Sequence, residues 1–444
     1  MSKRVLLVHP EISRTKYNFA GVIENEPLEL EYIVPVLRGA GYEAEVFDKA
    51  VEEKSVRDKI SEFSPDVFYV CGRARQENFM KEYCAAAKRE NAVTIAGGIH
   101  VQHNWERLYS AEVDYILTTF DVFKILDILE LKNPEEITGI CYKKEGVWVK
   151  NAAEPFDIKR LPLPDRSYFY SHLSNYRYLE LLPCAHLRTA YSCAYDCNFC
   201  YRSTLNCGKY VTRDIEDVVS EIENIECENI FIIDDDFLIS PKRIEKFTTL
   251  VKKRGIKKKY VCYGRVDFII NNKELVRGLK EIGFYYILAG LEAIDDKRLD
   301  NYNKHTNTDA NIECVDFLND IGINIMGLFI VDLDITARDF AEMYKWIRLH
   351  KIKHAAVSIF TPELGLDIYN RYENRIITKN PEHWDYLHVV ARPDIGIRRY
   401  YFHYYILLIK LLLLAKRQGV YDFLDYKGYL KSFVKGIFKK EKGV

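Results

Sequence analysis

The sequence has no excess of charge of either sign and no long apolar run at its start. Its 444 residues contain 64 Lys and Arg against 65 Asp and Glu, a formal net charge of −1, which argues against a general nucleic-acid binder. The first apolar run, in MSKRVLLVHP, has only four apolar residues, so it resembles neither a signal peptide nor a transit peptide. We therefore expect a cytoplasmic protein.

Methionine and tryptophan are also scarce, with four of each, whereas tyrosine is abundant at 32 residues. The overall composition, 48% hydrophobic and 29% charged, is that of an ordinary globular protein. The length exceeds one ordinary core and predicts two or three domains. The tyrosines could serve as exposed stacking rings, but we favour a tyrosine-rich core.

Short apolar runs alternate with helical patterns over residues 1–131, which predicts βαβ units and a parallel, doubly wound sheet. The expected strands are Arg4–His9, Ala44–Phe47, Val67–Cys71, Val93–Ala96 and Tyr115–Leu117.

Residues 132–185 are weakly patterned and contain two closely spaced prolines, so we expect a linker there. From Thr189–Tyr191, expected to be the first strand, six βα units occupy residues 186–370. The alternation of strands and helices alone does not choose between a partial barrel and a second open sheet.

Residues 371–444 are expected to form a helical C-terminal region. Its apolar run, Tyr400–Ala415, contains His403 and Lys410 and is too short to cross a bilayer, so a buried helix is expected. The following stretch, Leu430–Lys442, has a basic amphipathic pattern. It favours either contact with an anionic membrane surface or a solvated, docked terminal helix.

The strongest motif is Cys193-Ala-Tyr-Asp-Cys197-Asn-Phe-Cys200. A structural zinc site would need a fourth ligand, which Cys184 or Cys207 could supply. A [4Fe-4S] cluster held by three thiolates instead leaves one iron open to a substrate or cofactor. Most of the other cysteines are expected to be packed thiols in a reducing compartment.

This CxxxCxxC motif, with an aromatic residue before its last cysteine, resembles that of the radical S-adenosylmethionine (SAM) superfamily. The resemblance implies a partial (β/α)6 barrel and a [4Fe-4S] cluster bound by Cys193, Cys197 and Cys200. SAM would chelate the open iron and yield a 5′-deoxyadenosyl radical at the C-terminal ends of the strands.

Further residues occur in the order of that family. Asp234, Asp235 and Asp236 end an expected strand, where carboxylates could accept hydrogen bonds from the SAM ammonium, although at least one could cap a helix instead. The resemblance also implies SAM contacts for Arg265, for Glu292 in a Gly-x-Glu strand, and for Lys304. The segment Phe329–Asp334 departs from the family's Gly-Pro-rich turn.

The expected first domain resembles that of the cobalamin (B12)-binding subclass, a flavodoxin-like domain preceding the barrel. Gly97 and Gly98 could let the backbone approach a bulky ligand, and Cys71 at a strand end is a further candidate contact. Alternatively, the two glycines form only a tight turn. The cobalt-ligating pattern D-x-H-x-x-G is absent.

The resemblance therefore implies a cobalamin-dependent radical SAM enzyme that methylates an unactivated carbon. Radical cyclisation, rearrangement or oxidation with the same cofactors is the alternative, and a non-catalytic iron–sulfur or zinc protein is a third hypothesis. A flavodoxin or ferredoxin reductant is implied as a partner. The substrate is expected to be a small or lipid-like molecule, with peripheral membrane contact through the basic C-terminal stretch.

Overall fold

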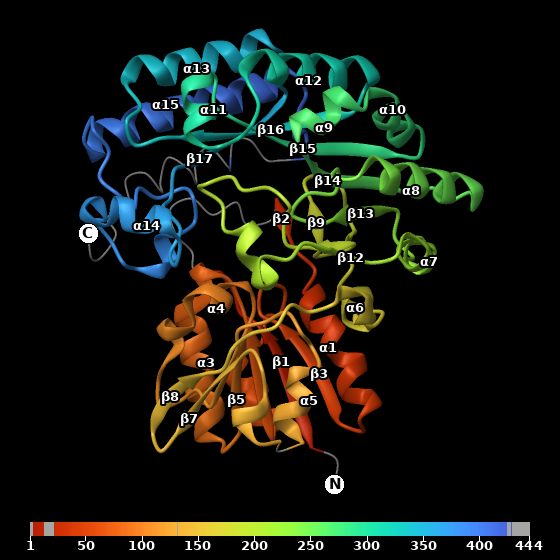
Figure 1. The fold of residues 1–444 in the computed structure, drawn as a ribbon, viewed down its shortest axis with the longest axis vertical. Coiled ribbons are helices and arrows are strands. Elements are labelled where there is room, and N and C mark those ends of the chain that lie inside the picture. The colour runs from red at the N-terminus through yellow and green to blue at the C-terminus, as the bar shows by residue number, and fades with distance from the viewer. Residues whose placement is uncertain (1–2, 13–21, 131, 424–427, 429–444) are drawn as a thin grey trace.

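The computed structural model describes residues 3–12, 22–130, 132–423 and 428. Figure 1 shows an N-terminal α/β domain and a larger α/β barrel, with the C-terminal helix α15 beside the helices of the barrel. The basic stretch Leu430–Lys442 lies outside the described residues.

The N-terminal domain is a doubly wound sheet, as predicted. Its five parallel strands run in the order β3-β1-β4-β5-β6, which is the flavodoxin-like order. Apolar residues on both faces of these strands pack against the helices. The strands are β1 (Arg4–His9), β3 (Glu43–Asp48), β4 (Val67–Cys71), β5 (Val93–Gly97) and β6 (Tyr115–Leu117), and the helices are α1 (Leu28–Gly39), α2 (Val56–Phe63), α3 (Glu77–Arg89), α4 (Ile99–Asn104) and α5 (Lys124–Leu129).

The sheet continues into the region predicted as a linker. Strands β7 (Ile140–Lys144) and β8 (Val147–Lys150) form an antiparallel hairpin that pairs with β6. Its turn places Glu145 and Gly146 at positive φ, the geometry of tight hairpins. The prediction of a linker at 132–185 is therefore wrong over this hairpin. Its two strands are short and flanked by polar residues, and their pairing with the N-terminal sheet leaves no clear pattern in the sequence.

Residues 151–183 then cross to the second domain. This segment contains α6 (Ser167–Ser171) and β9 (Arg177–Tyr178), and β9 pairs with β2 (Ile23–Glu24) from the N-terminal domain. The two chain segments, far apart in sequence, thus meet as a small antiparallel β2–β9 strand pair.

The second domain is a six-stranded parallel barrel whose strands follow one another in chain order. Its sheet ends at β10 on one side and at β17 on the other, so the barrel is partial. The strands are β10 (Cys184–Leu187), β13 (Asn229–Ile232), β14 (Lys259–Gly264), β15 (Phe284–Glu292), β16 (Asn324–Val331) and β17 (His354–Ile359). The helices are α7 (Ile215–Asn224), α8 (Pro241–Lys253), α9 (Val266–Asn271), α10 (Lys273–Glu281), α11 (Asp296–Asn301), α12 (Thr308–Ile321) and α13 (Ala337–Leu349).

The first barrel strand differs from the prediction. It is β10, whereas β11 (Ala190–Tyr191) within the predicted Thr189–Tyr191 pairs antiparallel with β12 (Val211–Thr212) outside the barrel. The segment Cys-Ala-His-Leu of β10 is wholly buried, but its histidine interrupts the apolar pattern that marks buried strands.

The C-terminal region contains α14 (Asp367–Tyr372) and α15 (Ile397–Arg417), and α15 packs on α13. Tyr400 and Tyr404 are fully buried and donate hydrogen bonds to the Val331 and Val357 carbonyls, both at 2.8 Å. This confirms a buried face on the predicted helix and a tyrosine-rich core. Among the described residues, no helix combines the length and apolarity needed to span a membrane.

Candidate active site

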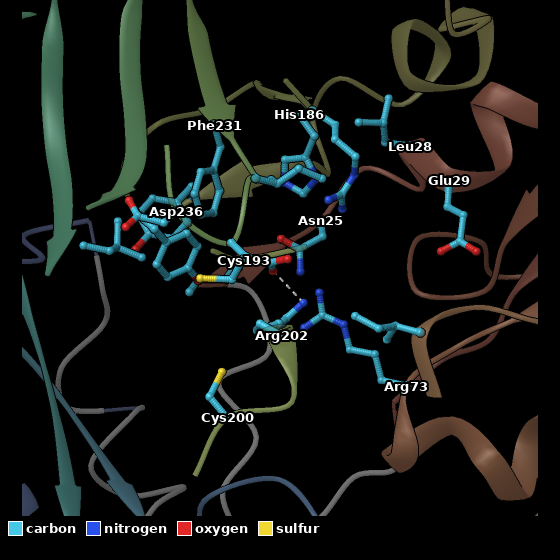
Figure 2. Close-up of a pocket in the computed structure, with 18 of the residues that line it drawn as sticks. Asn25, Leu28, Glu29, Arg73, His186, Cys193, Cys200, Arg202, Phe231 and Asp236 are labelled. Atoms are coloured by element: carbon cyan, nitrogen blue, oxygen red, sulfur yellow. Dashed lines mark ion pairs between the residues drawn. The ribbon is translucent and has the colours of Figure 1, made fainter. Parts of the chain in front are cut away.

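The barrel and the N-terminal domain face each other across a cavity of about 590 Å³. Its walls come from the C-terminal ends of strands in both domains, where α/β folds commonly bind ligands. Figure 2 shows Cys193, Arg202 and Asp236 on the barrel side, and Glu29 and Arg73 from the N-terminal domain.

The three motif cysteines all line this cavity. They lie in the loop that follows β11, which begins at Ser192 with a positive φ of 70°. Burial raises the pKa of Cys193 to about 11 and that of Cys200 to about 12.

Across the described part of the chain, no three His, Cys, Asp or Glu side chains stand close enough to hold a single metal ion. A four-iron cube spreads its thiolate ligands farther apart than one ion does. Three cysteine sulfurs on one cavity wall, of the ligand type that such clusters require, therefore fit a cluster.

Arg265, at the end of β14, contacts this loop directly. Its guanidinium lies over the Tyr195 ring, 3.9 Å from the ring centroid, and donates to the Cys197 sulfur at 3.6 Å. It also donates to the Lys304 carbonyl at 2.7 Å and to Asp267 at 2.9 Å. Arg265 therefore connects the cysteine loop to the segment between β15 and α12 that contains Lys304.

The three consecutive aspartates after β13 have different roles. Asp234 is fully buried and accepts from the backbone N–H groups of Thr189 and Ala190 at 2.7 and 2.9 Å, away from the cavity. Asp235 lines the cavity and pairs with Arg202 at 2.9 Å. Of the three aspartates predicted to contact SAM, Asp234 instead stabilises the backbone after β10 and does not border the cavity.

Asp235 and Asp236 each keep one buried oxygen without a hydrogen-bond partner among the described residues, but Asp235 is already paired with Arg202. In Asp236, Oδ1 accepts from the Leu238 backbone N–H at 2.9 Å, whereas the buried Oδ2 has no hydrogen-bond partner among the described residues. Burial raises the pKa of Asp236 to about 7. A buried polar atom without a partner is unfavourable, so a cationic ligand in the cavity would satisfy it.

Glu292 and Lys304 form a buried ion pair on the cavity wall, with Nζ and Oε1 2.7 Å apart. Glu292 adopts a positive φ of 56° at the end of β15. At Gly290, a Cβ atom would lie 2.3 Å from the Glu292 carboxylate and 2.6 Å from the Lys304 ammonium. The glycine of the Gly-x-Glu pattern therefore makes room for this ion pair.

The N-terminal domain contributes the ends of β1 and β4. His9 and Cys71 line the cavity, and His9 Nδ1 lies 3.0 Å from the buried Asp48 carboxylate. Burial lowers the pKa of His9, but Asp48 more than offsets this, so the pKa is raised overall. Burial also raises the pKa of the Cys71 thiol.

Gly97 and Gly98 do not border the cavity. A Cβ at Gly97 would lie 2.1 Å from the Tyr69 hydroxyl, and Gly98 has a φ of 92° with Gly72 backbone 2.7 Å from its Cβ position. Both glycines are thus required by internal packing, which supports the tight-turn alternative.

Three arginines on the cavity wall were missed from the sequence: Arg73, Arg188 and Arg202. Arg73 follows the end of β4 by two residues, so its strand-end position was a usable signal. Arg202, two residues after the last motif cysteine, was identifiable only once its partner Asp235 was known.

Two protein-family models match separate parts of the chain. The model described as "Radical SAM superfamily" matches residues 187–347, and the model described as "B12 binding domain" matches residues 23–122. The first covers the barrel from the end of β10 to α13, including the cysteine loop, and the second covers four of the five parallel strands of the N-terminal sheet.

Curated relatives cover nearly the whole chain. Hopanoid C-3 methylase of Methylococcus capsulatus is 25% identical over 90% of this chain and 78% of the relative. Anaerobic magnesium-protoporphyrin IX monomethyl ester cyclase of Rubrivivax gelatinosus is 24% identical over 99% of this chain and 83% of the relative.

Solved structures share the fold. TsrM from Kitasatospora setae, a radical S-adenosylmethionine methyltransferase solved with cobalamin and a [4Fe-4S] cluster, has a TM-score of 0.67 and 16% identity, over 85% of this chain and 80% of TsrM. OxsB with aqua-cobalamin has a TM-score of 0.65 and 18% identity over 78% of this chain. The chain spans about half the length of OxsB, 52%.

Proposed function

Because the chain is a radical SAM protein with an N-terminal B12-binding domain, we propose that it methylates an unactivated carbon of a small or lipid-like molecule. When bound, the cluster with SAM supplies a carbon-centred radical, and cobalamin supplies a transferable methyl group. One observation carries the proposal: a single cavity is bordered by the cysteine loop of the barrel and by the strand ends of the N-terminal domain. A substrate there would reach both groups without leaving the protein.

Different residues on the barrel side would bind the cluster and SAM. Cys193, Cys197 and Cys200 would hold the cluster. The free Oδ2 of Asp236 is placed to accept hydrogen bonds from the SAM ammonium. The buried pair of Glu292 and Lys304 would present polar groups to SAM at little net charge.

On the opposite wall, Cys71, Arg73 and Gln76 come from the end of β4 and the turn after it, and His9 comes from the end of β1. These side chains would face cobalamin. Gln76 Nε2 lies 3.2 Å from His9 Nε2, and Asp48 holds the other ring nitrogen, so the imidazole is fixed at both ends.

Radical cyclisation is the second candidate, because a curated relative that covers 99% of the chain is named as a cyclase. The two reactions differ in their products from SAM. Methyl transfer requires one SAM as radical source and a second as methyl donor, so S-adenosylhomocysteine accumulates together with 5′-deoxyadenosine. Cyclisation yields 5′-deoxyadenosine and methionine, with no S-adenosylhomocysteine.

The substrate class is proposed from the relatives. Hopanoid C-3 methylase, by its name, acts on a hopanoid, which favours a polycyclic or otherwise lipid-like substrate here. A flavodoxin or ferredoxin is the proposed reductant. The proposed location is the cytoplasm, with peripheral contact at the membrane.

The test begins with anaerobic purification in the presence of hydroxocobalamin, followed by iron, sulfide and cobalt analysis. Reduced protein is then incubated with SAM and an extract of polycyclic lipids, and the nucleoside products are quantified. Cobalt with iron, and equal amounts of S-adenosylhomocysteine and 5′-deoxyadenosine, would support methylation. Iron without cobalt would refute it, and 5′-deoxyadenosine alone would favour cyclisation.

A further inference from the structure

A second cavity, of about 300 Å³, lies where the barrel sheet ends at β17. It is bordered by β17, by helix α15 and by residues in or next to the β2–β9 strand pair. Aliphatic side chains dominate its wall. They include Val22, Leu179, Met326, Ile352, Leu408, Leu411 and Leu412.

This cavity reaches into the barrel interior. Val22, Leu179 and Met326 belong to the apolar cluster that fills the barrel, and Ala356 packs against it. Ile23 borders both this cavity and the larger one, and it is 38% exposed. The β2–β9 strand pair therefore lies between the two cavities.

The distance between the cavities along β16 is short. Met326 lines the apolar cavity, and Leu328 lines the larger one. Residues two apart on a strand point to the same face and are separated by about 7 Å. An elongated molecule could thus place one end near Asp236 and Arg265 and its apolar body beside β17.

The outer face of α15 is apolar as well. Phe402 and Leu413 are 60% and 46% exposed, and Ile406 and Ile409 between them are half-buried. Their spacing of four, three and four residues places them on one stripe. Ile409 also lines the apolar cavity, so the stripe reaches the mouth of that cavity.

The charge of α15 identifies the surface that this stripe fits. The helix contains no acidic residue. Its basic residues occur within both end turns and near the middle, on either side of the stripe by helical spacing; they are Arg398, Arg399, Lys410, Lys416 and Arg417. An apolar stripe flanked by basic residues is the pattern of helices that lie in the surface of an anionic bilayer.

We propose that α15 rests on an anionic lipid bilayer and that the cavity between α15 and β17 receives the hydrocarbon body of an amphiphilic substrate drawn from it. The substrate's reacting end then lies in the larger cavity. This inference rests on the proposed function for its chemistry, but the two binding events that it predicts require neither SAM nor the cluster.

The cavity is tested with cis-parinaric acid, a fatty acid whose fluorescence rises in an apolar environment. The full-length chain should bind it. Ala356→Phe, which adds a ring at a partly exposed position of the wall, should weaken binding by about tenfold, because several methylene groups lose their contacts. Leu412→Trp fills the cavity from the side of α15 and should weaken binding to a similar extent. Unchanged affinity in both folded variants would overturn the cavity assignment.

The bilayer contact is tested by flotation with phosphatidylcholine vesicles, with and without phosphatidylglycerol. The wild-type chain should float with the anionic vesicles. Phe402→Glu/Leu413→Glu should reduce the bound fraction at least about tenfold, because two apolar side chains no longer enter the bilayer. Val147→Glu/Leu163→Glu changes the charge equally at positions 67% and 58% exposed and should float like wild type.

Three other results would refute the bilayer contact. The first is equal flotation of both double variants, and the second is no flotation of the wild type. The third is a wild-type dimer in solution that only the α15 double variant dissociates, which would make the stripe an interface between two copies. Formation of 5′-deoxyadenosine, measured separately, tests the proposed chemistry, so failure of either inference can be recognised by itself.

Discussion

Asp236 should make SAM binding depend on pH. Burial raises its pKa to about 7, so the carboxyl is neutral in acid and becomes an anion as the pH rises. Only the anion attracts the SAM ammonium strongly. Because an α-amino group has a pKa of about 7.7–8.0, most of the SAM ammonium is still protonated at pH 7.5, so affinity should increase with pH over the range in which Asp236 ionises.

The magnitude follows from the ionised fraction. With a pKa of about 7, roughly a tenth of the carboxyls are ionised at pH 6 and roughly three quarters at pH 7.5. Because roughly a third of the SAM ammonium has lost its proton at pH 7.5, affinity should rise about sixfold, or about 1.1 kcal/mol. Isothermal titration of SAM into the cluster-loaded protein, anaerobic and without reductant, measures this rise.

Two variants separate the roles of the neighbouring carboxylates. Asp236→Asn should bind SAM weakly at both pH values, and the rise should disappear. Asp235→Asn removes the partner of Arg202 and should leave the rise in place. The reasoning is refuted if wild-type affinity is the same at both pH values, or if Asp236→Asn retains the rise.

Three further predictions concern other parts of the site and its scaffold. Replacing any cysteine of the motif within residues 193–200 by Ala should remove the iron and visible absorbance of the reconstituted protein, whereas Cys184→Ala, a buried thiol of β10, should retain both. Lys304→Met leaves the buried Glu292 carboxylate without its ion-pair partner and should lower the free energy of unfolding by about 3–5 kcal/mol. Urea denaturation measures this loss, and Lys304→Met/Glu292→Leu should recover most of it; a double variant no more stable than the single one would argue against the ion pair. Tyr404→Phe deletes the donor to the Val357 carbonyl and should cost about 1 kcal/mol, seen as a lower Tm; an unchanged Tm would contradict the contact.

The order of strands and helices was predictable because most elements bury apolar residues at regular spacing. Helix α2 matches the periodicity, with Val56, Ile60 and Phe63 buried. The failures occurred where a strand is too short or too exposed to show a pattern of its own, or where it pairs with a distant segment. Strand β8 has no fully buried residue, and β2 and β9 comprise two residues each, so neither carries a periodic signal of its own.

The same division applies to the site. The cysteine motif was recognisable because its three ligands lie within eight residues. Asp234, Asp235 and Asp236 were indistinguishable in sequence, since their roles depend on Thr189, Arg202 and an unpaired oxygen. Gly97 was expected near a ligand, but the constraint on it is the Tyr69 ring of the adjacent strand.

The junction between the domains bears on how a substrate reaches the larger cavity. Arg166, buried in the crossing segment, bonds Glu26 two residues before α1, the His186 carbonyl of β10 at 2.7 Å and Glu221 of α7 at 2.9 Å. Separating the domains would break the bond between Arg166 and Glu26, and until water reached both groups each would be an unpaired buried charge, which costs several kcal/mol. Entry by parting the domains is therefore disfavoured. The apolar cavity at β17 is lined mostly by aliphatic side chains, and Ile23 of β2 borders both it and the larger cavity, which Glu26 also lines. An apolar molecule entering there would meet mainly apolar contacts.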